Sequence, residues 1–202
     1  MNSAQAFRRI NLFVLLTLIS CTTTENRMTA EEEVNVRPVG MATVSAPDQS
    51  FLIDRFENSI VNGFAVSTPN ATPATHITFS DARHHCESQG KKICTDRQWM
   101  DACLGINRYT FTYDSRQRKG RCNVDSSRPS TTGSYRQCVT DGNIYDMLGN
   151  VMEWVQSDEN PESGLLAGGS YRTGAETSCF TRRVTTLEAK SMEAGFRCCA
   201  KQ

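Results

Sequence analysis

The chain lacks several features that would assign it quickly to a class of protein. Its 202 residues carry 22 basic and 22 acidic side chains, so neither sign of charge is in excess. Nucleic-acid-binding proteins usually show a basic excess, and we therefore expect no nucleic-acid partner. None of the nine cysteines forms a CxxC pair, which argues against a zinc finger. No apolar run is long enough to cross a bilayer as a helix.

The N-terminal residues have the pattern of an export signal. Arg8 and Arg9 precede an apolar stretch over residues 10–19, which suits the hydrophobic core of a signal peptide. The stretch ends in Leu-Ile-Ser-Cys, which resembles a bacterial lipobox, so we expect cleavage before Cys21 and lipidation of its sulfur. The alternative is a plain secretory signal in which this cysteine has no special role.

The segment after the lipobox is polar and shows little apolar periodicity, so it cannot bury enough surface to fold alone. We therefore divide the chain into a lipoprotein signal peptide (1–20), a lipidated cysteine with a flexible tether (21–46) and a globular domain (47–202). The expected location is the bacterial cell envelope, with attachment to the membrane through the lipid. An aspartate directly after the lipidated cysteine would disfavour the outer membrane. This chain has Thr22 at that position, so we favour the outer membrane.

The most specific stretch of the domain is Asp-Met-Leu-Gly-Asn-Val-Met-Glu-Trp, residues 146–154. If its Gly-Asn pair turns the backbone, Asp146 and Glu153 converge together with the carbonyls of Gly149 and Val151. An all-oxygen cage of this kind suits a hard cation, so we expect a structural calcium ion. The alternative is a turn leading into a strand whose Trp154 fills the core.

Further motifs follow one another along the chain in the order of one known family. Residues 51–57, 77–86, 90–103, 168–171 and 195–198 flank the 146–154 stretch, and together they resemble the formylglycine-generating enzyme (sulfatase-modifying factor) family. The resemblance covers about residues 50–200. It implies a C-type-lectin-like α+β fold with two short helices, short antiparallel strands, long loops and paired terminal strands.

The composition and local signals agree with such a fold. For the first helix we expect Ser80 as N-cap, and for the second a capping box made by Thr95 and Gln98. Residues 104–141 are polar and rich in Gly, Ser, Thr and Arg, which predicts short strands and long loops. A domain with this much loop has little core, and disulfides would stabilise it.

An exported chain with eight cysteines besides Cys21 is expected to form four disulfides. The family resemblance implies the pair Cys86–Cys198. Side chains alternate along a strand, so Cys199 points away from Cys198 and needs another partner, for which Cys94 is our expectation. The two remaining pairs follow by elimination: Cys122 with Cys138, and Cys103 with Cys179.

The family's chemistry is the oxidation of a sulfatase cysteine to formylglycine, by O₂ and a copper(I) ion held by two cysteines. In this chain the position of the first cysteine holds Thr173, and Cys179 lies one residue from the second. A single thiolate would not reproduce a two-sulfur site, so we do not expect copper. Ser170 matches a serine near the family's active site, and with Cys179 it is the remaining catalytic candidate. Asn123 and Val124 resemble the start of a second calcium site.

Function follows the site and not the fold. We therefore expect an envelope lipoprotein whose domain is non-catalytic and acts in assembly or binds a protein or carbohydrate. The ligand-facing candidates are Arg172, Thr173, Arg182 and Arg183, although the arginines could equally be solvated surface charges. One alternative is a copper-dependent formylglycine-generating oxidase with an altered metal site. Another is a structural lipoprotein that supports a larger complex.

Overall fold

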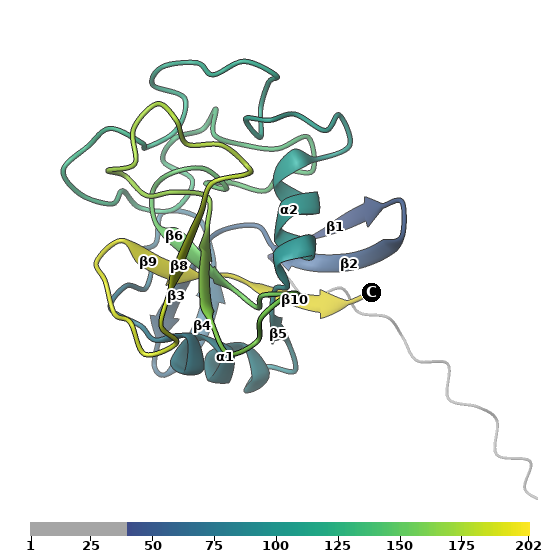
Figure 1. Ribbon diagram of the computed structural model, residues 1–202, viewed down its shortest axis with the longest axis vertical. Coiled ribbons are helices and arrows are strands. Elements are labelled where there is room, and N and C mark those ends of the chain that lie inside the picture. The colour runs from purple at the N-terminus through teal and green to yellow at the C-terminus, as the bar shows by residue number, and fades with distance from the viewer. Residues whose placement is uncertain (1–39) are drawn as a thin grey trace, which may run out of the picture. The chain divides into compact units, whose positions relative to one another are not determined.

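The computed structural model describes residues 40–202 (Figure 1). The expected signal peptide, Cys21 and most of the expected tether lie outside the described residues. Within them, Met41–Ala46 form strand β1, which pairs over its whole length with β2 (Gln49–Asp54). The boundary expected at residue 46 is therefore wrong, because six residues of the predicted tether belong to a sheet.

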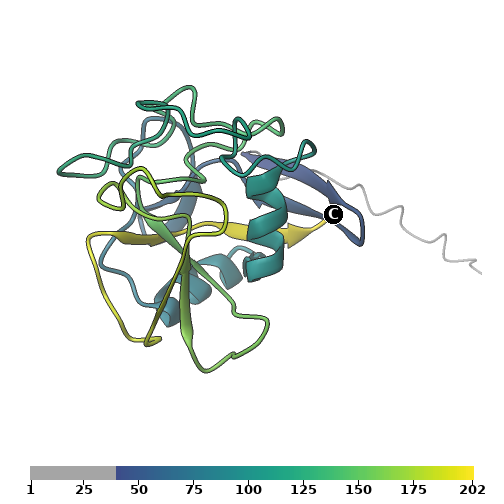
Figure 2. The same ribbon diagram turned by 45° about the horizontal axis from the view of Figure 1, so that its top comes forward.

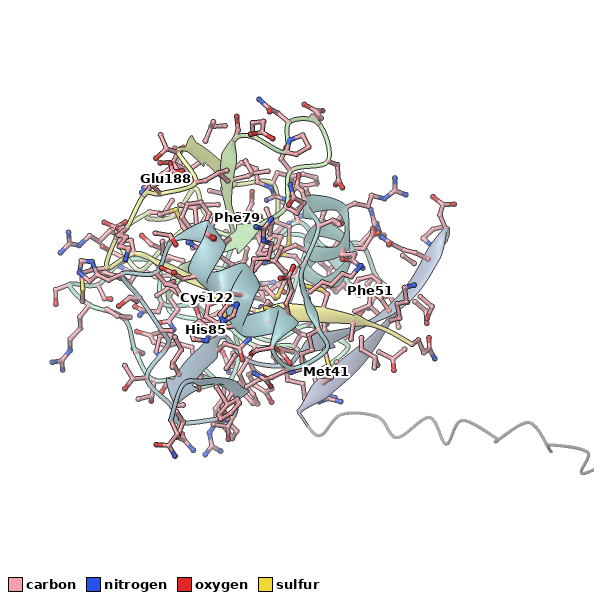
Figure 3. The ribbon with its side chains drawn as sticks, turned by 90° about the horizontal axis from the view of Figure 1, so that it is seen from below. Met41, Phe51, Phe79, His85, Cys122 and Glu188 are labelled. Carbon is pink, nitrogen blue, oxygen red and sulfur yellow. A yellow bond between two sulfur atoms is a disulfide. The ribbon has the colours of Figure 1, made fainter. Side chains whose placement is uncertain are left out.

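Two nine-residue helices each begin at a capping box. Helix α1 (Phe79–Glu87) is capped by Thr78, whose side chain accepts from the Asp81 N–H. The expected N-cap, Ser80, lies instead inside the first turn, since the threonine–aspartate pair supplies the reciprocal cap. Helix α2 (Asp96–Leu104) begins at the predicted Thr95–Gln98 box. Figure 3 views the domain from the side of α1 and labels Phe79 and His85 on that helix.

The first sheet joins the two ends of the domain. Its order is β1-β2-β10-β5, where β10 is Cys198–Lys201 and β5 is Lys92–Ile93. Every pair in it is antiparallel. The contact between β2 and β10 is the pairing of terminal strands that the family resemblance implies.

A second sheet carries the 146–154 stretch. Its order is β8-β7-β6-β9, with β8 at Arg182–Thr185, β7 at Gly164–Ala167, β6 at Met152–Val155 and β9 at Ala194–Phe196. The β6–β9 pair is parallel, whereas only antiparallel strands were expected. Parallel pairing is possible because a long connection separates the two strands in sequence. A separate hairpin consists of β3 (Asn58–Val61) and β4 (Phe64–Ser67).

Two buried clusters lie on opposite sides of the last strand. Trp99 and Cys199 belong to one cluster, and Trp154 and Cys198 to the other. The alternation of side chains along a strand therefore separates the two adjacent cysteines, as expected. The four disulfides pair Cys86 with Cys198, Cys94 with Cys199, Cys103 with Cys179, and Cys122 with Cys138.

The connection from α2 to β6 forms long loops that gather on one side of the domain (Figure 1, Figure 2). It contains neither a helix nor a named strand, so the short strands expected there are reduced to two isolated β-bridges, Phe111 with Asp114 and Val139 with Tyr145. The Cys122–Cys138 disulfide closes a loop within it, and Cys103–Cys179 ties the end of α2 to the segment after β7. Among the described residues, no helix has the length and apolar character needed to cross a membrane.

Candidate functional site

The segment in which the family resemblance places two copper-binding cysteines holds Thr173 and a disulfide-bonded Cys179. Thr173 has a hydroxyl, which accepts a hydrogen bond from the Ser170 N–H at 2.7 Å. Cys179 is buried and bonded to Cys103. Within residues 40–202 all eight cysteines belong to disulfides, so none can act as a soft metal ligand without reduction.

Ser170 lies beside a carboxylate. Its hydroxyl is fully buried and donates to Glu193 Oε2 at 2.7 Å. Arg172 and Arg183 reach the same carboxylate at 3.8 and 3.9 Å. Sequence reasoning missed Glu193, because a lone glutamate near an exposed segment gives no signal of its own. This hydrogen bond links the turn after β7 to the residue that precedes β9.

The expected ligand-facing arginines divide into two kinds. The side chains of Arg172 and Arg183 are 60% and 51% exposed, which leaves them accessible to a ligand. Arg182 is only 17% exposed and donates to Asp96 Oδ1 at 2.6 Å. Its guanidinium also lies 4.9 Å from the centre of the Trp99 ring. Burial lowers the pKa of Arg182, opposed by the charge of Asp96. Arg182 therefore packs mainly against helix α2 and the segment before β8, although it also lines a cavity together with Asp96 and Met100, so its ligand-facing role stays a prediction.

The 146–154 stretch positions a buried ion pair. Glu153 on β6 accepts from Arg197 Nε and Nη2, both at 2.6 Å. Trp99 donates its indole N–H to the same carboxylate at 2.7 Å. Both partners of the ion pair are at most 1% exposed, and Arg197 is the single residue between β9 and β10. The arginine also donates to the Asp54 and Tyr145 carbonyls, so the ion pair fixes several segments of the domain together.

Two further carboxylates lie in the same region. Glu57 accepts from the Val151 N–H at 3.0 Å and from the Asn150 side chain. Burial raises the pKa of Glu57 well above its ordinary value, and the charges of Asp146 and Glu153 raise it further. Burial likewise raises the pKa of Asp146 to about 6, although the Gly133 N–H and Arg197 oppose the shift. One guanidinium thus lies among three buried carboxyl groups.

Arg197 stays protonated in this environment. Burial alone would lower its pKa, but the charge of Glu153 and the hydrogen bonds to it outweigh burial and raise the pKa. Sequence reasoning missed both Glu57 and Arg197 as members of the site. Only Arg197 had a signal in the sequence, because it stands between Phe196 and Cys198 in a short apolar segment, and a charge buried there needs a buried partner.

The two expected calcium segments lie against each other. Asn123 accepts from the Asn150 N–H through its carbonyl at 2.8 Å and donates from its side chain to Asn150 Oδ1. Gly149 has φ +76°, and a side-chain carbon there would lie 2.2 Å from the Asn123 carbonyl oxygen. The same carbon would lie 2.7 Å from Cγ1 of Val124. The turn of the expected Gly-Asn pair is therefore present, and it meets the Asn123–Val124 segment at backbone distance.

Of the two carboxylates expected to bind calcium, Asp146 has a free oxygen and Glu153 does not. Asp146 is buried next to this turn and uses Oδ2 to accept from the Gly133 N–H. Glu153, the second expected carboxylate, uses both oxygens on Arg197 and Trp99. A cation at Glu153 would compete with a guanidinium for the same oxygens. Calcium binding stays a prediction, and its strongest candidate ligand is Asp146.

The geometry defines a disulfide-rich α+β domain with a C-type-lectin-like fold. Several solved structures share this fold, and two of them illustrate the similarity. Treponema denticola variable protein 1 superposes with a TM-score of 0.62 at 13% identity, over 80% of this chain and 92% of that one. The crystal structure of CarF gives a TM-score of 0.58 at 17% identity, over 76% and 87%.

The family assignment comes from the sequence itself. Residues 27–202 match the FGE-sulfatase family, described as the sulfatase-modifying factor enzyme 1-like domain, and the chain belongs to that family. The inactive C-alpha-formylglycine-generating enzyme 2 of Bos taurus is 27% identical over 62% of this chain and 49% of its own length. The formylglycine-generating enzyme of Mus musculus is 24% identical over 63% and 44%. The hercynine oxygenase of Mycolicibacterium smegmatis is 28% identical over 51% and 26%. The chain thus spans about half the length, or less, of these relatives.

Proposed function

We propose that this chain is a non-catalytic binding or assembly member of its family, which retains the fold and has lost the oxidase site. The proposal rests on two residues: Thr173 stands where the family has a cysteine, and Cys179 is bonded to Cys103. Copper(I) chemistry of the expected kind needs two soft thiolates. A hydroxyl and a disulfide sulfur are poor substitutes, so the site favours recognition over oxidation.

Similarity to a relative whose name states that it is inactive supports this proposal. The family also contains active members, such as the formylglycine-generating enzyme and hercynine oxygenase named above. Because the fold serves both kinds of protein, the decision rests on the side chains of the site. Arg172 and Arg183, both half exposed and linked to Glu193, are the residues we propose to face a protein or carbohydrate ligand.

We further propose that the domain works in the bacterial envelope, anchored through a lipid on Cys21. The support is the Leu-Ile-Ser-Cys sequence after a short basic and apolar segment. A thioether lipid at this cysteine would leave the eight cysteines of the domain to pair among themselves. We also propose that Asp146 binds a structural calcium ion in this domain.

A copper titration combined with an activity assay tests the proposal. The purified, non-reduced protein is offered copper(I) in competition with a chromophoric chelator, and then a cysteine-containing sulfatase peptide in air. We expect no tight copper binding and no loss of mass from the peptide cysteine. Conversion of that cysteine to formylglycine would overturn the proposal in favour of a copper-dependent oxidase. The formylglycine-generating enzyme itself, assayed in parallel, controls for the reaction conditions.

A further inference from the structure

A cavity of about 370 Å³ lies in the loops between α2 and β6, and no residue of the Thr173–Cys179 segment lines it. Its volume is at the lower end of the range for small-molecule sites. The lining combines two phenol rings, two guanidinium groups and several polar side chains: Tyr109, Thr112, Tyr113, Arg121, Arg136 and Asp141, together with Gln137, Val139 and Thr140.

The two arginines of the cavity are not neutralised by described residues. Within residues 40–202, the guanidinium groups of Arg121 and Arg136 form no ion pair and no hydrogen bond. Arg108 and Arg118 in the same loops both bind aspartates. Arg121 lies instead 5.2 Å from the centre of the Tyr113 ring, which orients it without consuming its donors.

Two disulfides hold the walls of the cavity. Arg121 immediately precedes Cys122 and Gln137 immediately precedes Cys138, and these cysteines are bonded with Cα atoms 4.8 Å apart. Tyr109 follows α2 closely, where the Cys103–Cys179 bond fixes the helix end. A site built on cross-linked loops loses less conformational entropy when a ligand binds.

A buried hydroxyl in the lining has no partner. Thr112 is 2% exposed, and no described residue hydrogen-bonds to its Oγ1. Its φ of +34° is unusual for a β-branched residue. A buried polar atom that remains without a partner is costly, so its presence beside a cavity suggests an external partner.

We infer that this cavity binds an acidic saccharide, that is, a sugar ring bearing one carboxylate or sulfate. Tyrosine faces pack against the apolar C–H face of a sugar ring, and arginine forks pair with the anion. Asp141 and Gln137 provide acceptors for hydroxyl groups. With two arginines and one aspartate, the lining suits a single negative charge better than a polyanion.

The cavity lies in the basic part of the chain. Residues 105–141 contain seven basic and three acidic side chains, although the whole chain has no net charge. Such a local excess attracts anions to the loops from a distance. The inference goes beyond the proposed function, since it concerns other residues and names a ligand class.

Calorimetric titration with galacturonic acid, a single sugar ring with one carboxylate, tests the inference, with the neutral sugar galactose and inorganic sulfate as comparison probes. We expect the full chain to bind the acidic saccharide and not the neutral one. Replacing both cavity arginines, Arg121→Gln with Arg136→Gln, should weaken binding at least about tenfold, because each charge-assisted contact is worth about that factor. Far-ultraviolet circular dichroism checks that the variant is folded.

A control double variant distinguishes binding at the cavity from a general effect of positive charge in the loops. Arg116→Gln with Arg128→Gln removes the same charge from exposed loop positions that do not line the cavity. This control should bind within about twofold of the parent chain. An equal loss in both variants, equal affinity for the neutral saccharide, displacement by sulfate at equal affinity, or no binding of the acidic saccharide would each overturn the inference. Any of these results leaves the proposed function standing, since that rests on Thr173 and Cys179.

Discussion

The guanidinium of Arg197 binds both carboxylate oxygens of Glu153 at 2.6 Å in a position that solvent does not reach. Glu153 belongs to the most specific stretch of the sequence, and Arg197 to the short segment that links the two sheets. The arginine therefore provides a cation for a carboxylate that the sequence led us to assign to calcium. This pair is the structural centre of the domain, and several predictions depend on it.

Breaking the pair should strongly destabilise the domain. Arg197→Met removes the positive charge and leaves Glu153 buried among Glu57 and Asp146, so we expect a loss of about 3–5 kcal/mol in the free energy of unfolding. Urea denaturation followed by tryptophan fluorescence measures it. The double variant with Glu153→Gln should be less destabilised than the single variant. If both variants lose the same stability, the charge of Glu153 is not what Arg197 compensates.

Stability without calcium should depend on pH through Asp146. Its pKa is about 6 in the folded protein and close to 3.8 in the unfolded chain, so the folded state holds the proton more tightly. This contribution is complete below the unfolded pKa and is lost as pH rises through 6, up to about 3 kcal/mol. Glu57 shifts in the same direction.

The difference between the parent chain and Asp146→Asn isolates the contribution of Asp146. In EDTA, the stability of the parent relative to the variant should fall between pH 4.5 and 7, since the asparagine cannot titrate. Thermal unfolding of both proteins across this range provides the measurement. A relative stability that increases with pH would mean that Arg197 and the Gly133 N–H hold Asp146 ionised.

Gly149 should tolerate no side chain. Both Gly149 (φ +76°) and Gly63 (φ +85°) have left-handed backbones, but only Gly149 lies against another backbone segment. Gly63→Ala should cost about 1–2 kcal/mol from the conformation alone. Gly149→Ala adds a clash with the Asn123 carbonyl and should cost at least about 1 kcal/mol more. Equal losses in chemical denaturation would show that the contact between the 123–124 segment and the turn is loose.

Calcium should stabilise the protein if Asp146 is its ligand. A ligand that binds only the folded state at a hundredfold excess over its Kd contributes about 2.7 kcal/mol. We expect a higher melting temperature in calcium than in EDTA, with a larger rise at pH 7.5 than at pH 5 because protons compete for Asp146. Asp146→Ala should abolish the rise. No response of the parent chain to calcium would remove the calcium assignment.

Much of the fold followed from local sequence signals. The Thr95–Gln98 cap predicted the start of α2, and alternation along the last strand separated Cys198 from Cys199. Two features did not follow. Ser80 and Thr78 are both good caps, and the choice depends on Asp81 three residues after the threonine. Strand β1 has no strong pattern of its own and is defined by its pairing with β2.

The site was less predictable than the fold for a physical reason. Ligand assignment from spacing treats each carboxylate as available, whereas availability depends on partners brought together by folding. Arg197 is distant from Glu153 in sequence, and only the parallel pairing of β6 with β9 brings them together. In contrast, the absence of sulfur at position 173 could be read directly from the sequence.

The most direct test of the central claim is the chemical state of Cys179 in the native protein. Non-reduced protein is treated with an alkylating reagent, digested and analysed by mass spectrometry. We predict a peptide pair cross-linked through Cys103 and Cys179, with no alkylated Cys179. Alkylated Cys179, together with copper retained by the untreated protein, would contradict the account and restore the oxidase.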